Sequence, residues 1–388
     1  EGAMSFVGIN RLRSARVVYF GPGAARELGP ALEELGGERV VLVTDPGVRA
    51  AGLVERVLEG ITAEVTVYDG VQPEPPYRLA EECAALLRDT GAQVVVGLGG
   101  GSSLDTAKMA AALVANPGGV PDYWGLDRLR RPGLPVVAIP TTAGTSSEIS
   151  PAAVFVDAEA GAKRGVNSSL LLPAVAILDP ELTLGLPPAL TASTGMDALT
   201  HAIEAYTSPK ASPITDGTCE RAVRLIGEHL PRAYARGDDL DARTGMLAGC
   251  YFAGLALAEV NVGIIHGLAQ GLGGRYPVAH GVANALLLPY GMTFNRIACR
   301  ARYARLAEAL GEVVIGRSLD EASHLAVEAV RRLTQELGIP QRLRELGVPH
   351  EALDGIAQAA METQTRQFGN NARTVTLEDA RRVLEEAW

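Results

Sequence analysis

The sequence predicts an α/β domain built on a parallel sheet, followed by an all-helical domain. Its 388 residues exceed the size at which one hydrophobic core usually stops growing, so two domains are the default expectation. Short β-rich runs alternate with helical runs in the first half, and only helical patterns continue to Trp388. We therefore expect domains at residues 1–187 and 188–388.

Five runs in the first half are typical of strands. The later ones are continuously apolar, which indicates a parallel sheet covered by helices on both faces. Such sheets bind ligands at the carboxyl ends of their strands, so the residues after each strand form the expected cofactor site. The expected strands lie at 17–20, 39–44, 63–70, 93–101 and 135–142, the helices at 23–35, 77–89 and 103–115, and a closing strand with its exit within 162–182.

The segment GGGSSLDTAK, residues 99–108, follows one of these strands. Its three glycines allow a tight turn, and Ser102 or the next serine should open a helix whose free N–H groups attract a pyrophosphate. The spacing matches neither GxGxxG nor the Walker motif, and a purely structural turn is the alternative. We expect Asp105 to hold this loop or contact the cofactor, and Lys108 to be a solvated helix residue.

Three further features favour a nucleotide site. The loop IPTTAGTSSE, residues 139–148, offers hydroxyl donors after the next buried strand. Asp45 follows a strand where a carboxylate commonly binds an adenosine ribose and repels a 2′-phosphate, which favours NAD over NADP; the alternative is a helix N-cap before Pro46. Lys163 is expected to contact ribose or phosphate, or else to be a solvated surface lysine.

In the second half, GMDALTHAIEAY (195–206) places Asp197 and His201 four residues apart on one helical face. A carboxylate and an imidazole so placed can hold a divalent first-row metal ion, although an ordinary hydrogen-bonded helix pair is the alternative. His266 and His280 lie in apolar sequence and need polar partners if they are buried. A metal ion shared with the first pair would satisfy both.

Composition favours small-molecule chemistry. The net charge of -10 argues against nucleic-acid or anionic-membrane partners, and the 47% hydrophobic content is ordinary for a globular protein. The four cysteines form no CxxC pair, which suits reduced thiols. Neither an 18-residue apolar run nor a secretory leader is evident, so we expect a cytoplasmic protein.

The motifs GGGSSLDTAK, PTTAGTSSE, GMDALTHAIEAY and HGLAQGLGGRYPVAHG, in this order and spacing, resemble the iron-dependent, or group III, alcohol dehydrogenases. The resemblance implies a Rossmann-like domain in a dehydroquinate synthase-like fold, a homodimer or larger homo-oligomer, and a metal-dependent, NAD(H)-linked alcohol dehydrogenase or aldehyde reductase. Fe²⁺ is the implied metal, with Zn²⁺ or another divalent ion allowed. The implied metal ligands are Asp197, His201, His266 and His280, and the implied cofactor contacts are Asp45, Gly99, Gly100, Gly101, Ser102, Asp105, Thr141, Thr142, Thr145 and Lys163.

One position departs from that pattern. Gln270 stands where family members often carry a histidine implicated in proton transfer, and glutamine exchanges no proton near neutral pH. The remaining alternatives are a maleylacetate reductase- or glycerol dehydrogenase-like oxidoreductase, a dehydroquinate synthase-like lyase, and an inactive nucleotide-binding relic. The full ligand set argues against the maleylacetate branch, and the lack of a basic cluster in the helical half argues against the lyase.

Overall fold

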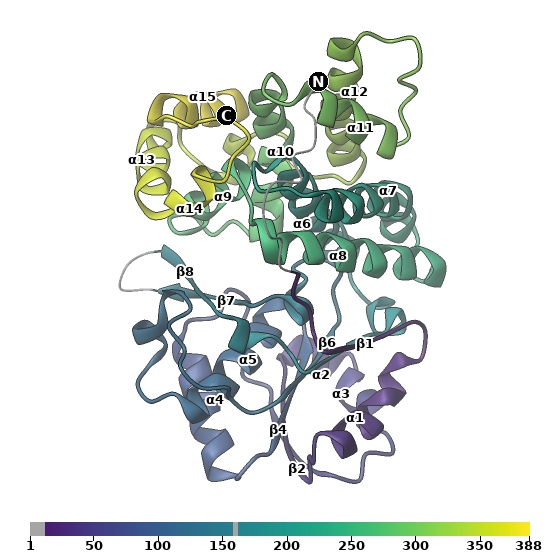
Figure 1. Ribbon diagram of the computed structural model, residues 1–388, viewed down its shortest axis with the longest axis vertical. Helices are drawn as coiled ribbons and strands as arrows, with labels where there is room; N and C mark the ends of the chain where they lie inside the picture. The colour runs from purple at the N-terminus through teal and green to yellow at the C-terminus, as the bar shows by residue number, and fades with distance from the viewer. Residues whose placement is uncertain (1–11, 158–161) are drawn as a thin grey trace. The chain divides into compact units, whose positions relative to one another are not determined.

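The computed structural model describes residues 12–157 and 162–388. The chain divides between Leu186 and Pro187 into two compact units. Residues 13–186 form an α/β unit, and residues 187–388 form a helical unit (Figure 1).

The α/β unit is built on a six-stranded sheet in which every pair of neighbouring strands is parallel. The predicted fold class, a parallel-sheet domain followed by a helical domain, is therefore confirmed. In spatial order the strands are β1 (Val17–Phe20), β9 (Val175–Leu178), β6 (Val136–Pro140), β4 (Val94–Gly99), β2 (Arg39–Val43) and β3 (Glu64–Tyr68).

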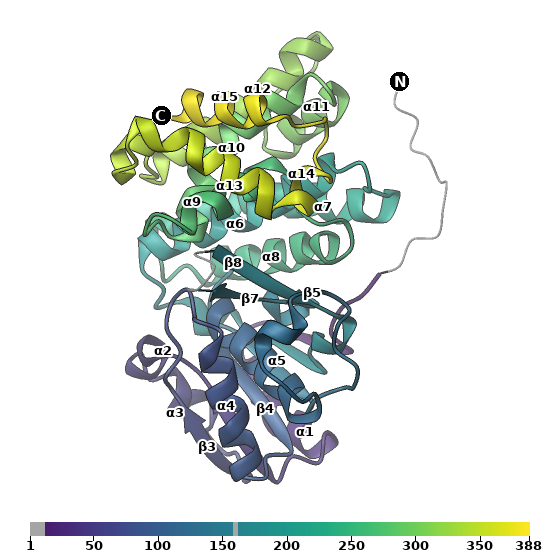
Figure 2. The same ribbon diagram turned by 90° about the vertical axis from the view of Figure 1, so that its left-hand side faces the viewer.

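Helices cover both faces of this sheet. On β2, Val41 packs in the core that contains buried residues of α4 (Arg78–Asp89) and α5 (Gly101–Ala115), which Figure 2 shows lying over one face. Its neighbour Leu42 packs in the core formed with α1 (Leu28–Glu34) and α3 (Leu53–Val57). Successive side chains of a strand point to opposite faces, so the continuously apolar strands reflect burial on both sides. A short helix, α2 (Pro46–Ala50), follows β2.

A second, three-stranded sheet was not predicted. It joins β5 (Gly125–Leu126), β8 (Ala162–Asn167) and β7 (Ala152–Asp157), with β7 and β8 antiparallel. The expected closing strand is β9, within the apolar part of 162–182, whereas the start of that segment belongs to the second sheet. Polar residues interrupt β8, which hid it from a search for continuously apolar strands.

Residues 187–388 contain helices and no strand. The helix α6 (Pro188–Thr207) is buried along most of its length and packs against α7, α8 and α10. The others are α7 (Pro213–Ala235), α8 (Leu240–Val260), α9 (Ile264–Gly273), α10 (His280–Arg296), α11 (Arg300–Ala309), α12 (Leu319–Glu336), α13 (Leu353–Thr363), α14 (Thr365–Phe368) and α15 (Leu377–Ala387).

Among the described residues, no single helix has the length and apolar character needed to cross a membrane. By length and composition alone, α8 and α9 taken together would be long and apolar enough to cross a membrane, but they meet at a bend of 94°.

Candidate active site

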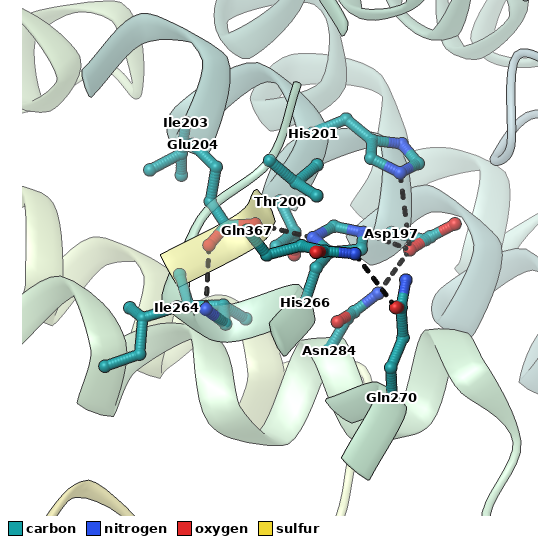
Figure 3. A network of polar contacts seen from close by, with 12 residues as sticks. Asp197, Thr200, His201, Ile203, Glu204, Ile264, His266, Gln270, Asn284 and Gln367 are labelled. Carbon is teal, nitrogen blue, oxygen red and sulfur yellow. Dashed lines mark hydrogen bonds and ion pairs between the residues drawn. The ribbon is translucent and has the colours of Figure 1, made fainter. Parts of the chain in front are cut away.

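The four predicted metal ligands converge in the helical unit. Asp197 and His201 project from α6, His266 comes from α9, and His280 is the first residue of α10. The Nε2 atoms of His201, His266 and His280 lie 4.0, 3.5 and 3.7 Å, respectively, from Oδ1 of Asp197. Figure 3 shows Asp197, His201 and His266 around this point, and the rings of the latter two stack with centroids 4.6 Å apart.

Local sequence explains this convergence. The four-residue spacing puts Asp197 and His201 on one face of α6. The start of α10 can approach α6 because Gly281 has no side chain: a Cβ there would lie 2.4 Å from the carbonyl oxygen of Ser193. His280 is thereby carried to the same face as the α6 pair.

The geometry fits a single metal ion. Ligand atoms about 2.1 Å from a tetrahedral ion lie about 3.4 Å from one another. The potential ligand atoms of Asp197, His201 and His266 all lie within 4.8 Å of one another, and all three residues are buried. Nε2 of His266 is buried without a hydrogen-bond partner. A cation would satisfy that atom.

The ionisable side chains in this cluster shift one another's pKa values. Burial alone would raise the pKa of Asp197, but His201, His280 and His266 outweigh it and hold the pKa well below its usual value. Burial lowers the pKa of His266, whereas the nearby carboxylates of Asp197 and Glu204 raise it to about 9. A buried carboxylate that is kept ionised among imidazoles favours a cation at their centre.

Two residues around the cluster were missed in the sequence. Nδ2 of Asn284 donates to Oδ1 of Asp197 at 2.7 Å and lies 3.1 Å from Nε2 of His280. Oε2 of Glu204 lies 2.5 Å from Nδ1 of His266. The available signal was spacing: Asn284 follows His280 by four residues on α10, and Glu204 follows His201 by three on α6.

Gln270 lies one turn after His266 on α9. Its Oε1 accepts a hydrogen bond from Nε2 of Gln367 at 3.1 Å, as Figure 3 shows. Gln367 also donates to Oε1 of Gln364 at 2.8 Å. Because Gln367 occupies the carbonyl end of the Gln270 carboxamide, the Gln270 side chain is oriented and its NH₂ group remains as a donor.

In the α/β unit, the predicted glycine turn packs directly against the hydroxyl-rich loop. The strand β4 ends at Gly99, where φ is +146°, and α5 begins at Gly101 rather than at the serines expected to open it. A Cβ on Gly101 would lie 2.7 Å from Cγ2 of Thr145, and one on Gly100 would lie 3.6 Å from Oγ1 of Thr142. Thr141 N–H donates to the carbonyl oxygen of Gly99 at 3.0 Å. The two loops therefore form one surface beside the amino end of α5, at which Ser102 is the second residue.

Asp45 performs the N-cap role and also lies beside this turn. Its Oδ1 accepts the Val48 N–H at 3.0 Å, which caps α2. Its Oδ2 accepts the Ser103 hydroxyl at 3.2 Å. Asp45 can therefore cap α2 with one carboxylate oxygen while the other faces the glycine turn, where the ribose was expected.

Asp105 holds the hydroxyl-rich loop. Its Oδ1 accepts the Ser147 hydroxyl at 2.5 Å, and its Oδ2 accepts the Val154 N–H at 2.8 Å. The expectation that Lys108 is solvated was wrong: its side chain is fully buried, and Nζ lies 3.1 Å from Asp105 and donates to the Ser147 carbonyl oxygen at 3.0 Å. Burial lowers the pKa of Lys108, an effect that Asp105 opposes.

Lys163 lies on β8, and its ammonium forms an ion pair with Glu74. Its side chain is only 7% exposed, so the alternative of a solvated surface lysine was wrong.

Both halves of the chain match known family models. The model described as "Iron-containing alcohol dehydrogenase" matches residues 15–180, and the one described as "Fe-containing alcohol dehydrogenase family, C-terminal" matches residues 191–388. The chain is 38% identical to the NAD-dependent methanol dehydrogenase of Bacillus methanolicus, over 95% of this chain and 97% of that protein. It is 37% identical to lactaldehyde reductase of Escherichia coli, over 98% of this chain and all of that protein.

A solved structure of 1,3-propanediol oxidoreductase superposes with a TM-score of 0.95 at 38% identity, covering 98% of this chain and 100% of that one. The chain therefore belongs to the iron-containing alcohol dehydrogenase family. This membership confirms the family and the reaction class predicted from the sequence, an NAD(H)-linked alcohol dehydrogenase or aldehyde reductase.

Proposed function

We propose that Asp197, His201, His266 and His280 bind one divalent metal ion, and that the protein uses this ion and NAD(H) to interconvert small alcohols and aldehydes. The observation that carries the proposal is the meeting of three imidazole Nε2 atoms within 4.0 Å of Oδ1 of Asp197. Relatives that are named for methanol, lactaldehyde and 1,3-propanediol support a small substrate.

The donor set defines what the site can hold. One carboxylate and three neutral imidazoles leave a divalent ion with a net charge near +1, and such a set accepts Fe²⁺, Zn²⁺ and other first-row ions. We propose Fe²⁺, which the family resemblance favours. When bound, the ion supplies Lewis acidity that stabilises negative charge on a substrate oxygen, and the nicotinamide supplies or accepts the hydride.

The α/β unit supplies the proposed nucleotide site. The N–H groups at the start of α5, around Gly100, Gly101 and Ser102, suit a pyrophosphate because they carry the positive end of the helix dipole. The side-chain carboxylate of Asp45 would accept ribose hydroxyls and repel a 2′-phosphate, so we propose NAD(H) in preference to NADP(H). The further proposed contacts are Gly99, Thr141, Thr142, Thr145 and Lys163, with Asp105 acting by holding the loop that carries Ser147.

Gln270 limits how a proton can move. A carboxamide hydrogen-bonds a substrate oxygen but takes up no proton near neutral pH. Gln270 therefore acts by orientation, and proton transfer uses water or ribose hydroxyls instead of this side chain.

The proposal includes the setting of the enzyme. We propose that 1–187 is the nucleotide-binding domain and that 188–388 is the metal-binding domain. We also propose a cytoplasmic homodimer or larger homo-oligomer without nucleic-acid or membrane partners. The net charge of -10 and the four free cysteines support this setting.

The test is NADH oxidation with short aldehydes, measured on metal-free and Fe²⁺-loaded protein. We expect turnover that rises with Fe²⁺ and is lost in His266→Ala, while His324→Ala, which alters an exposed histidine on α12, behaves as the wild type. If neither chelation nor His266→Ala changes the rate of turnover, the metal-binding role is rejected.

A further inference from the structure

Glu204 is a buried carboxylate with two partners near the proposed metal centre. It projects from α6 with 3% of the residue exposed. Its Oε1 accepts the Ile265 N–H at 2.7 Å. Its Oε2 lies 2.5 Å from Nδ1 of His266, a contact drawn in Figure 3. A single carboxylate thus contacts both the backbone at the start of α9 and the histidine that follows.

The first contact fixes where α9 begins. The opening N–H groups of a helix have no partners within the helix. Here Asn371 Oδ1 accepts from Ile264 N–H at 3.2 Å, and Glu204 accepts from the next N–H. The chain closes tightly on these caps, because a Cβ on Gly263 would lie 2.9 Å from Asn371 Oδ1 and 3.1 Å from Glu204 Oε1.

The second contact fixes the chemistry of the ring. An ionised carboxylate only accepts hydrogen bonds, so Nδ1 of His266 must carry the proton that faces Glu204. The lone pair of neutral His266 then lies on Nε2, the nitrogen 3.5 Å from Asp197 Oδ1. Carboxylates that bind the far nitrogen of a ligating histidine fix its tautomer and increase its basicity as a ligand.

We infer that Glu204 is a positioning residue that holds His266 in the Nδ1–H tautomer and thereby increases metal affinity at the four-ligand centre. This inference rests on the proposed function, because it requires His266 to ligate the metal. The competing explanation is that Glu204 serves only to cap α9. Both explanations predict a loss of stability when Glu204 is changed, but only ours predicts a loss of metal affinity beyond that of other buried-carboxylate variants.

The variant Glu204→Gln separates the two explanations. Its carboxamide can keep the cap only by placing its oxygen at Ile265 N–H, which turns its NH₂ group toward His266. Nδ1 must then accept, and the proton moves to Nε2, the nitrogen proposed to bind metal. If the amide turns the other way, its NH₂ group faces the Ile265 N–H and the cap is lost.

The measurement is the Zn²⁺ dissociation constant of metal-free protein, obtained by competition with a chromophoric chelator, together with its thermal unfolding midpoint. We expect Glu204→Gln to bind Zn²⁺ about 10- to 100-fold more weakly than the wild type. The matched control is Asp216→Asn, which changes another buried carboxylate in the helical unit, one paired with Arg302. It should lower the unfolding midpoint and leave the Zn²⁺ affinity unchanged.

The outcomes are distinguishable. Leucine can accept no hydrogen bond from Nδ1 in any orientation, so wild-type affinity in Glu204→Leu as well as in Glu204→Gln, with His266→Ala weakened, would overturn the inference and leave the metal site intact. Equal affinity in the wild type and His266→Ala would reject the proposed function itself. If Glu204→Gln does not fold, ¹⁵N NMR of histidine-labelled, metal-free wild type at a pH where the His266 ring is neutral decides: a proton on Nδ1 of His266 supports the inference, and a proton on Nε2 contradicts it.

Discussion

Oδ2 of Asp45 lies 3.2 Å from the hydroxyl of Ser103, so the carboxylate that caps α2 also contacts the first turn of α5. A cap and a charge are thus combined in one side chain. Substitution by alanine would remove both, at a cost of roughly 1 kcal/mol for the cap alone, whereas asparagine keeps the capping oxygen and removes only the charge.

For Asp45→Asn we expect the ratio of kcat/KM with NADPH to that with NADH to rise, because the repulsion of a 2′-phosphate is lost. Steady-state kinetics with both cofactors measure this ratio. Asp239→Asn, at the N-cap of α8, is the control and should leave it unchanged. An unchanged ratio in Asp45→Asn would remove Asp45 from cofactor selection.

The hydrogen bond from Gln367 orients the side chain of Gln270. As a carboxamide, this side chain exchanges no proton near neutral pH. We expect Gln270→His to give a kcat that falls below about pH 6.5, the ordinary pKa of histidine, as the new imidazole becomes protonated. The wild type should lack this step, which pH profiles of kcat over pH 5.5–8.5 will check. Identical profiles would mean that position 270 takes no part in proton transfer in either form.

The close contact between Gly101 and Thr145 predicts a sharp steric requirement. A Cβ at position 101 would meet Thr145 Cγ2 at 2.7 Å, so Gly101→Ala should destabilise the protein by about 1–3 kcal/mol and weaken NADH binding. Gly185→Ala is the control because a Cβ there meets nothing within 4 Å, and it should stay within about 0.5 kcal/mol of the wild type. Denaturant unfolding and NADH fluorescence titration measure the two effects. Equal stability of both variants would show that the two loops shift to accommodate the added methyl group at position 101.

Glu148 predicts a pH-dependent stability. Burial raises its pKa from 4.5 to about 7, although Lys108 opposes the shift. Below pH 4.5 the carboxyl group is protonated in both states. As the pH rises toward 7, the unfolded chain ionises first and the native state loses stability, by a few kcal/mol at most. Relative to Glu148→Gln, the wild type should therefore be less stable at pH 8 than at pH 5, as denaturant unfolding at both values will test. A difference that does not change with pH would show that Glu148 titrates normally.

The sequence predicted the parts of the fold that depend on local pattern. Continuous apolar runs located the buried strands, and the spacing of Asp197 and His201 placed both on one helical face. The strand β8 escaped because its polar residues gave no such run. Lys108 was misjudged because only tertiary structure shows that three backbone carbonyls surround its ammonium.

Around the candidate site, too, the contacts that depend on tertiary packing could not be predicted from local sequence. Glu204 and Asn284 are ordinary helix residues in the sequence, and their contacts with His266 and Asp197 arise only when α6, α9 and α10 pack together. The pairing of Gln270 with Gln367 joins residues 97 positions apart, which no local pattern reveals.

The most direct test of the metal centre is anomalous X-ray diffraction at the metal edge, from crystals of the protein loaded with Fe²⁺ or Zn²⁺. We predict one anomalous peak per chain, about 2.0–2.2 Å from a carboxylate oxygen of Asp197 and from Nε2 of His201, His266 and His280. A peak elsewhere, or none at these four side chains in fully loaded protein, would contradict the account.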